Sequence, residues 1–547
     1  MKYDYIIVGA GSAGCVLANR LSADPAVTVL LLEAGGPDTK LEIRIPAAYS
    51  RLSRSEVDWG FFTEPQKHVL DRRMYLPRGK TLGGCSSINA MAYVRGNRAD
   101  YDEWAALGNT GWSYEEVLPY FTRSEHNEQI LDSYHGQQGP LNITFAQRFR
   151  TPVADAFVEA CIQSGLPANP DFNGAEQLGA GLFQFTIKDQ KRHSTAGAFL
   201  KPVLQRPNLK VITHAHTRQV LIKNDRAVGV EFITGKSTQV AYASREVILS
   251  AGSFNSPQLL MLSGIGDADE LRKHQIPVRK HLPGVGKNLQ DHLFLSVSAL
   301  TTVPTANHYL KPHNQVLGIL NYLLFKKGMF TTSPLEANAF LKLTDSPDPV
   351  DFQLHFAPIH IGNDYKPDFY DASTYPRTNG FTILPTILKP KSRGYVGLRS
   401  SSPLDAPVIQ PNFLSEEDDV KTLIKGTRRA LEVMRAEALD AFRTQIITPP
   451  DQSSDEAILL HIKKVMETVY HPVGTCKMGH DEMAVVDSEL RVHGIEGLRL
   501  VDASIMPRII AGNTNAAVIM IGEKGADLVL GRKVEKVRKE EGIKGEK

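Results

Sequence analysis

Short apolar runs and one stretch of helical spacing follow one another at the start of the chain. Tyr5 to Val8 is an apolar, partly β-branched run, which is typical of a strand buried on both faces. From Ala13 to Leu21, apolar and small residues recur at helical spacing. Val27 to Leu32 is a second buried run, and it ends at Glu33. This order predicts a strand, a turn, a helix and a second strand.

The turn between the first predicted strand and the helix fits the pattern G-x-G-x-x-G, with Gly9, Gly11 and Gly14. In this pattern the first glycine makes a tight turn, the second lets a pyrophosphate approach the backbone, and the third lets helix and strand pack closely. The helix N-terminus then points free N–H groups at the phosphates, and Glu33 can bind ribose hydroxyls. The unit predicts a Rossmann-like α/β domain that binds a dinucleotide, and the acid favours FAD or NAD over NADP.

Further strand patterns occur later in the chain. Val247 to Leu249 is a buried run, followed by a glycine turn and a helix expected to open at Ser256 and Pro257, since proline is tolerated in the first helical turn. The stretch "LRLVDAS" reads as a strand that ends at Asp502, and a helix is expected from Val518 to Val529. These patterns add strands and helices to the same predicted α/β domain.

Residues 350–415 show a different pattern, in which apolar and polar positions alternate with period two among frequent prolines and glycines. This predicts an antiparallel sheet with loops, in a second domain of the α+β class. His355 and His360 lie on the alternating run, five residues apart. We expect them on opposite faces, one packed and one solvated, rather than as a metal-binding pair.

Composition narrows the class of protein. The chain has 547 residues, which is too long for one ordinary core, and its hydrophobic (42%) and charged (22%) fractions are those of a globular protein. A formal net charge of +2 does not suggest nucleic acid or an anionic membrane as partner. No run approaches the roughly 20 apolar residues that cross a bilayer, and the N-terminus lacks the pattern of a secretory signal. Four cysteines without C-x-x-C spacing suggest neither zinc nor a disulfide framework, so we expect a reduced, cytoplasmic protein without metal.

Two longer stretches carry a family resemblance. They are "GKTLGGCSSIN" from Gly79 to Asn89 and "GSFNSPQLLMLSGIG" from Gly252 to Gly266, and shorter ones read "VGKNLQDH", "HPVGTCKMG" and "GNTNAAVIMIGEKGAD". Together with the N-terminal glycine pattern they resemble the glucose-methanol-choline (GMC) family of FAD-dependent oxidoreductases, in particular its choline dehydrogenase-like and alcohol dehydrogenase-like members. The resemblance covers roughly residues 3–530 and departs from the usual pattern at Cys85, where a small residue such as serine is common.

The resemblance implies a division of the chain. Residues 1–150, 190–305 and 465–530 would form a discontinuous FAD-binding domain, and residues 151–189 and 306–464 a substrate-binding domain whose antiparallel sheet roofs the flavin. Residues 531–547 would be a charged tail. The residues implied to bind FAD are Gly9, Gly11, Ser12, Ala13, Gly14, Glu33, Ala34, Gly83, Gly84, Ser86, Asn89, Val220, Ala251, Gly252, Asp502, Ala503, Asn513 and Asn515. The position at which some members attach the flavin to a histidine is Ile88 here, so the resemblance implies non-covalent FAD.

The resemblance also implies a catalytic pair, His471 and Asn515. Alcohol oxidation by a flavin needs a base for the hydroxyl proton, and histidine is neutral near pH 7. It also needs a polar group that orients the alcohol so that its C–H points at the flavin. The expected reaction oxidises an alcohol, most simply a primary one, to an aldehyde, and passes the electrons to oxygen or a quinone-type acceptor. Cys476, close to the base, is expected to serve packing only.

Alternatives remain open on the same scaffold. The family includes hydroxynitrile lyases, which use FAD without net redox chemistry, and a light-driven fatty-acid decarboxylase with a cysteine in the substrate domain. No cysteine occurs between Cys161 and Cys476, which counts against the latter. Glu336 is either a pocket residue that selects cationic alcohols or a solvated loop acid.

Overall fold

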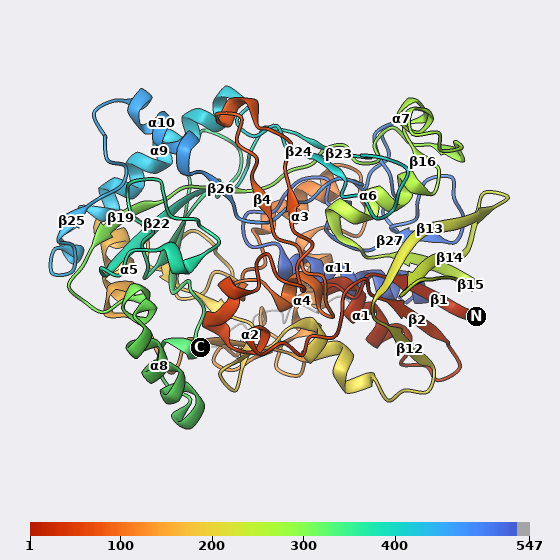
Figure 1. Cartoon of the computed structure of the whole chain (residues 1–547), viewed down its shortest axis with the longest axis horizontal. Helices are drawn as coiled ribbons and strands as arrows, with labels where there is room; N and C mark the ends of the chain where they lie inside the picture. The colour runs from red at the N-terminus through yellow and green to blue at the C-terminus, as the bar shows by residue number, and fades with distance from the viewer. Residues whose placement is uncertain (533–547) are drawn as a thin grey trace, which may run out of the picture.

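The computed structural model describes residues 1–532, so most of the predicted charged tail lies outside the described residues. Two large sheets organise the chain, one on each side of the molecule in Figure 1. The first has seven strands and the second has eight. Both the α/β unit at the N-terminus and a separate antiparallel sheet were expected, and both are confirmed.

The first sheet is mixed. Its strand order is β12-β2-β1-β15-β14-β13, with β27 paired to β15. Strands β12, β2, β1, β15 and β27 run parallel, whereas β13, β14 and β15 form an antiparallel meander. The bounds are Lys2–Val8 (β1), Val29–Leu32 (β2), Leu209–Ile212 (β12), Ala215–Lys223 (β13), Arg226–Thr234 (β14), Ser237–Leu249 (β15) and Leu498–Leu500 (β27). The parallel part is the buried, helix-covered sheet that the first apolar runs predict.

Two helices from opposite ends of the chain pack on each other beside this sheet. They are α1 (Ser12–Leu21) and α11 (Asn515–Leu530). A Cβ at Gly522 of α11 would come within 3.0 Å of the Ala13 Cα, so the glycine permits a close approach of the two helices. Arg20 and Glu523 join them through an ion pair at 2.6 Å. The segment that leads into α11 is thereby held against the glycine-rich turn.

The second sheet is antiparallel throughout and has the order β25-β19-β22-β21-β20-β8, with β18 paired to β22 and β26 paired to β18. Helices α5 (Pro152–Gln163), α9 (Glu417–Met434) and α10 (Asp455–Val465) share its apolar core. The strands span Gly179–Leu182 (β8), Leu293–Phe294 (β18), Val297–Leu300 (β19), Ala337–Leu341 (β20), Phe352–Ala357 (β21), Gly380–Ile387 (β22), Gln445–Ile446 (β25) and Glu467–Thr468 (β26). Since β18, β19 and β26 come from segments assigned above to the FAD-binding domain, the sheet extends past those boundaries, and the domain division itself stays a prediction.

Helix α6 (Gly252–Leu262) begins earlier than the sequence suggested. Pro257 lies inside the helix rather than in its first turn, and it cannot donate to the carbonyl of Ser253 four residues before it. The Thr475 hydroxyl donates to that carbonyl instead, at 2.7 Å. A side chain from a distant segment therefore satisfies the acceptor that proline leaves free, and the helix can continue.

The two histidines of the alternating run are both buried, so the expectation of one packed and one solvated ring was wrong. His355 lies on β21, where every residue from Phe352 to Ala357 is buried. His360 follows the strand, and its Nε2 lies 3.0 Å from the Thr378 carbonyl oxygen. Alternation did not report exposure here because both faces of β21 are covered.

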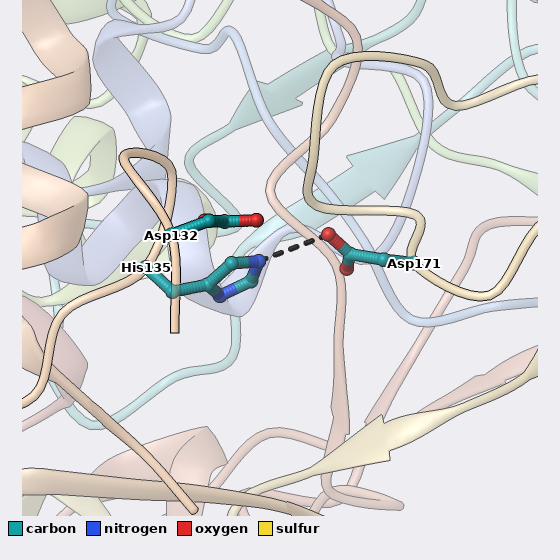
Figure 2. Close-up of side chains that lie close together, drawn as sticks. All are labelled: Asp132, His135 and Asp171. Carbon is teal, nitrogen blue, oxygen red and sulfur yellow. Dashed lines mark hydrogen bonds and ion pairs between the residues drawn. The ribbon is translucent and has the colours of Figure 1, made fainter. Parts of the chain in front are cut away.

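A group of charged side chains around the buried His135 lies outside the residues that line the main cavity. Figure 2 shows His135 with Asp132 and Asp171, and its Nε2 is 2.9 Å from Asp171 Oδ2. On the other side its Nδ1 is 2.8 Å from Glu125 Oε1. Burial lowers the pKa of His135, but the hydrogen bonds to Asp171 and Glu125 outweigh burial and raise the pKa to about 9. Each ring nitrogen of His135 faces a carboxylate oxygen, so the contacts described here form an ion-pair network.

This network predicts a loss of stability at high pH. The folded-state pKa of His135 is raised above its unfolded value of about 6.5. Its contribution is therefore complete below pH 6.5 and is lost as pH rises through about 9, by up to about 3 kcal/mol. We expect His135→Gln to flatten the fall in melting temperature over this window, whereas His480→Gln, at an exposed histidine, leaves it unchanged. Equal slopes in wild type and His135→Gln would contradict the assignment.

Candidate active site

A cavity of about 350 Å³ lies where the two sheets meet. Its wall includes Gly9 and Glu33 from the first sheet and His355 and Leu384 from the second. Residues predicted to bind the cofactor that line it are Gly9, Gly11, Ser12, Ala13, Glu33, Ala34, Gly84, Asn89, Ala251, Gly252, Asp502, Ala503, Asn513 and Asn515. The sequence motifs, although spread over the chain, thus converge on one space.

The glycine-rich turn forms one part of the wall. Gly11 is the N-cap of α1, and no side chain caps the helix there. A Cβ at Gly11 would meet only the Ser250 carbonyl oxygen, at 3.8 Å, so this position borders open space. A Cβ at Gly84 would lie 2.7 Å from the Gly11 Cα, which shows how closely the second glycine-rich loop covers the turn. An uncapped helix N-terminus beside open space fits a pyrophosphate.

Glu33 directly follows β2 and is buried. Its carboxylate accepts hydrogen bonds from the N–H groups of Ala10 (2.9 Å) and Gly35 (2.8 Å). Burial raises the pKa of Glu33 to about 7, against these two hydrogen bonds. Each oxygen keeps a lone pair for a further donor, so the residue fits the two hydroxyls of a ribose. Thr217, whose buried Oγ1 has no partner, lines the same cavity.

Four of the predicted cofactor residues are not on the cavity wall: Gly14, Gly83, Ser86 and Val220. A Cβ at Gly14 would lie 1.9 Å from the Gly9 carbonyl oxygen, so this glycine serves helix–strand packing. The Gly83 N–H donates to the Ala10 carbonyl at 2.7 Å, and Ser86 donates to the Gly83 carbonyl at 2.6 Å. Val220 does not line the cavity, to which β13 contributes Ala215, His216 and Thr217, and its contact with the cofactor stays a prediction.

His471 follows a residue with positive φ, Tyr470 (φ 63°), and lies on the cavity wall. The backbone N–H of His471 donates to Asp291 Oδ1 at 2.7 Å. Its Nδ1 is 3.1 Å from the Nδ1 of His292. His292 in turn places its Nε2 3.0 Å from the carbonyl oxygen of Leu388.

This chain of contacts assigns the proton on each ring. The Leu388 carbonyl only accepts, so His292 carries its proton on Nε2. Burial lowers the pKa of His292 to about 3, so the ring is neutral and its Nδ1 is an acceptor. His471 must then donate from Nδ1, which leaves its Nε2 with a lone pair that can accept a proton. Burial first, and then the neighbouring His292, His355 and Arg78, hold the pKa of His471 well below its ordinary value.

The polar residue beside this lone pair is Asn513, and not Asn515 as the sequence suggested. Asn513 Nδ2 lies 3.5 Å from His471 Nε2, and its buried Oδ1 has no partner. Asn515 instead accepts a hydrogen bond from the Ser12 hydroxyl at 2.6 Å. The difference arises because α11 begins at Asn515, three residues earlier than expected. The first helical residue therefore faces α1, whereas Asn513, before the helix, reaches His471.

Two family models match most of the chain. Both are described as GMC oxidoreductase, and they cover residues 3–294 and 390–522. This chain belongs to the GMC oxidoreductase family. It is an oxidoreductase of the class that acts on CH–OH groups, as expected, and the non-redox and light-driven alternatives are not favoured.

Relatives of this GMC oxidoreductase match over nearly the full length. "Alcohol dehydrogenase [acceptor]" of Pseudomonas putida is 44% identical over 97% of this chain and 96% of its own. "Oxygen-dependent choline dehydrogenase" of Sinorhizobium fredii is 43% identical with the same coverage. Among solved structures, pyridoxine 4-oxidase from Mesorbium loti superposes with a TM-score of 0.87 at 31% identity, covering 96% of this chain and 98% of its own. Formate oxidase from Aspergillus oryzae, studied for FAD modification, has a TM-score of 0.90 at 27% identity, covering 97% and 98%.

Several residues of this GMC site were missed by sequence reasoning. His292 lies in the motif "VGKNLQDH", which indicates the family but does not by itself indicate a role for its histidine. His355 was expected to be either a packed or a solvated histidine, but it lines the cavity with a buried Nε2 that has no partner among the described residues. Cys476 is buried, and burial raises the pKa of its thiol far above the ordinary value, in keeping with a packing role.

Within residues 1–532, no helix combines the length and apolar character needed to span a bilayer.

Proposed function

We propose that this protein oxidises a neutral, largely apolar alcohol to the carbonyl compound, with FAD bound in the cavity between the two sheets. The observation that carries the proposal is the acceptor nitrogen His471 Nε2, with the Asn513 Nδ2 donor 3.5 Å away, on the wall of the cavity that the glycine-rich turn also lines. A base and a hydrogen-bond donor thus meet beside the space for a dinucleotide. The residues around that space fit FAD, as the family membership also supports.

His471 and Asn513 have different roles in the proposed reaction. His471 Nε2 accepts the hydroxyl proton of the alcohol, and its Nδ1–H is held by His292, which keeps the ring oriented. Asn513 Nδ2 donates to the alcohol oxygen and fixes the direction of the C–H bond. The chemistry that a bound FAD supplies is acceptance of the hydride from the carbinol carbon. His355, with its unpartnered Nε2, offers a further polar contact to the substrate.

The charge of the cavity favours a neutral alcohol over a quaternary ammonium alcohol. Among the described lining residues, the carboxylates are Glu33 and Asp502, and both accept hydrogen bonds from backbone N–H groups. Glu336 is not on the wall, because its carboxylate accepts from the backbone N–H of Thr151 at 3.1 Å and from the Thr151 hydroxyl. Apolar side chains also line the cavity: Phe294, Leu335, Phe369, Leu384 and Val469. The name of the Pseudomonas putida relative, an alcohol dehydrogenase, supports the same choice.

We further propose non-covalent FAD, since Ile88 on the cavity wall offers no nucleophile. Oxygen or a quinone-type compound is the proposed electron acceptor. A cytoplasmic setting remains our prediction, supported by four cysteines that are all free thiols.

The visible spectrum of the purified protein tests the function directly. We expect a flavin band that a medium-chain primary alcohol bleaches under anaerobic conditions, and that choline bleaches more slowly at equal concentration. Denaturation with acid should release the flavin into the supernatant if it is held non-covalently. A yellow protein that no alcohol bleaches would overturn the proposal.

The asparagine assignment has its own test. Asn513→Ala removes a hydrogen bond to the reacting oxygen, and we expect flavin reduction to slow roughly 10–100-fold. Asn515→Ala removes the acceptor of the Ser12 hydroxyl beside the start of α1, and should weaken FAD binding with a smaller effect on the reduction rate. Stopped-flow reduction and FAD titration of both variants separate the two roles. The reverse pattern would restore Asn515 as the orienting residue.

A further inference from the structure

Helix α8 (Pro312–Phe325) exposes an apolar face that no other part of the described chain covers. Figure 1 shows this helix at the edge of the molecule, projecting beside the antiparallel sheet. Six large apolar side chains on it are between 46% and 70% exposed: Val316, Leu317, Leu320, Leu323, Leu324 and Phe325. Single exposed leucines are ordinary, but a contiguous apolar patch of this kind marks an interaction surface.

The exposed side chains form one stripe. Five of them follow the spacing i, i+1, i+4, i+7 and i+8 from Val316, which keeps them on one side of a helix. The other side of α8 is packed. A Cβ at Gly318 would meet the Phe330 ring at 2.9 Å and the Tyr309 ring at 3.1 Å, and buried Tyr322 donates to the Gln190 carbonyl at 3.1 Å. The helix is thus fixed to the protein with its apolar stripe turned outward.

The charged residues of the segment that carries the stripe are of one sign. Residues 306–335 contain three lysines, Lys311, Lys326 and Lys327, and no aspartate or glutamate, in a chain that has 62 basic and 60 acidic residues. Among the ion pairs of residues 1–532, none involves these three lysines. Lys311 and Lys326 stand at the two ends of the helix, as its N-cap and C-cap. The net charge of the whole chain, +2, does not reveal the local excess of positive charge in this segment.

The helix is also connected to the cavity. It leads through the turn η7 (Met329–Thr331), which contacts the 3₁₀ turn η1 (Pro46–Arg51). Tyr49 of η1 and Leu335, shortly after η7, line the cavity. The Ser333 hydroxyl donates to the carbonyl of Ala90, a further residue of the cavity wall, at 2.7 Å. A molecule that docks on α8 therefore lies beside the segments that enclose the active site.

We propose that α8 docks the protein on an anionic lipid surface. The leucine stripe enters the boundary between headgroups and acyl chains, and the lysines at the helix ends contact lipid phosphates. At 14 residues the helix is too short to span a bilayer but suits a position in the plane of the interface. A second copy of the chain is a poorer occupant, because a two-fold contact would bring the lysines of both copies together with no acid in the segment to pair with them. If the proposed alcohol oxidation is also correct, docking would set the cavity wall beside alcohols or quinones dissolved in the membrane.

Vesicle flotation with the full-length holoprotein tests the docking. We expect binding to vesicles of phosphatidylcholine mixed with phosphatidylglycerol, and weaker binding to phosphatidylcholine alone. Leu320→Asp combined with Leu324→Asp should lower the partition coefficient about 100-fold or more, because two apolar side chains in the interface become charged. Lys311→Ser combined with Lys327→Ser should lower it roughly 10-fold, for the mixed vesicles only.

The matched control places the same substitutions on exposed leucines elsewhere, at Leu131 and Leu404, and should bind as wild type. Bleaching of the flavin by a water-soluble alcohol is measured in parallel. Retained bleaching in the α8 variants shows that they are folded. Vesicle binding by a protein that no alcohol bleaches would support the docking and contradict the proposed function. Wild-type binding by the leucine variant would overturn the proposal. Failure of the wild-type protein to bind vesicles would also overturn the proposal. Light scattering that shows a dimer held together by the α8 leucines would do the same.

Discussion

Replacing His471 with alanine is expected to slow the reduction of the flavin by alcohol by roughly 10²–10⁴-fold, the usual cost of losing a general base. The reason is specific to the ring: His292 and Leu388 assign the Nδ1 proton, so Nε2 is the atom left to accept the hydroxyl proton. The variant should still bind FAD, because the glycine-rich turn and Glu33, which are expected to hold the cofactor, are unchanged. Anaerobic stopped-flow spectroscopy at saturating alcohol measures the rate.

The control for this variant is His461→Ala. His461 is also buried and its Nε2 lies 3.1 Å from the carbonyl oxygen of Ser296, but it is not part of the cavity wall. We expect its reduction rate to remain within a few-fold of wild type, since it holds main chain rather than substrate. Reduction of His471→Ala at the wild-type rate would remove His471 from the mechanism.

The same geometry fixes the direction of the pH dependence. Burial and the neighbouring rings keep the pKa of His471 well below its ordinary value of about 6.5, so the base is already neutral at pH 7 and stays so on moderate acidification. The reduction rate should therefore remain flat as pH falls through 6.5, and decline only at lower pH where His471 gains a proton. A decline of the reduction rate centred near pH 6.5 would contradict this prediction, because it would show that the pKa of His471 is not lowered.

The parts of this fold that the sequence predicted are those set by local periodicity. Strands β1 and β2 and helix α1 follow from apolar runs of the right length, and the glycine turn between them follows from backbone geometry alone. The start of α6 did not follow, because the partner of the carbonyl freed by Pro257 is Thr475, more than 200 residues away. No local pattern reports such a contact.

The candidate site divides in the same way. His471 was predicted from its motif, and it does lie on the cavity wall. Whether Asn513 or Asn515 faces it depends on which residue begins α11, and the packing of that helix on α1 decides this. That His355 lines the cavity was not predicted, because its strand is covered on both faces, which removes the contrast between polar and apolar positions on which the pattern depends.

Gly11 and Gly14, three residues apart in one turn, are expected to respond to alanine in opposite ways. At Gly14 the new Cβ would lie 1.9 Å from the Gly9 carbonyl oxygen, and main chain cannot move aside as a side chain can. We expect Gly14→Ala to destabilise the apoprotein by about 1–3 kcal/mol, at the upper end of that range. At Gly11 the backbone is ordinary (φ −74°) and the Cβ would stay 3.8 Å from its nearest neighbour, so stability should fall by less than about 1 kcal/mol.

Cofactor binding should rank the two variants differently. In Gly11→Ala the methyl group occupies the open space beside the uncapped start of α1, where the pyrophosphate is expected. Losing one or two charge-assisted hydrogen bonds there weakens FAD binding roughly 10–100-fold, although the apoprotein stays folded. Thermal unfolding of the apoproteins and titration with FAD measure the two effects separately. Wild-type FAD affinity in Gly11→Ala would mean that the phosphates do not lie on this turn, whereas loss of affinity at unchanged apoprotein stability can arise only if the open space at Gly11 belongs to the cofactor.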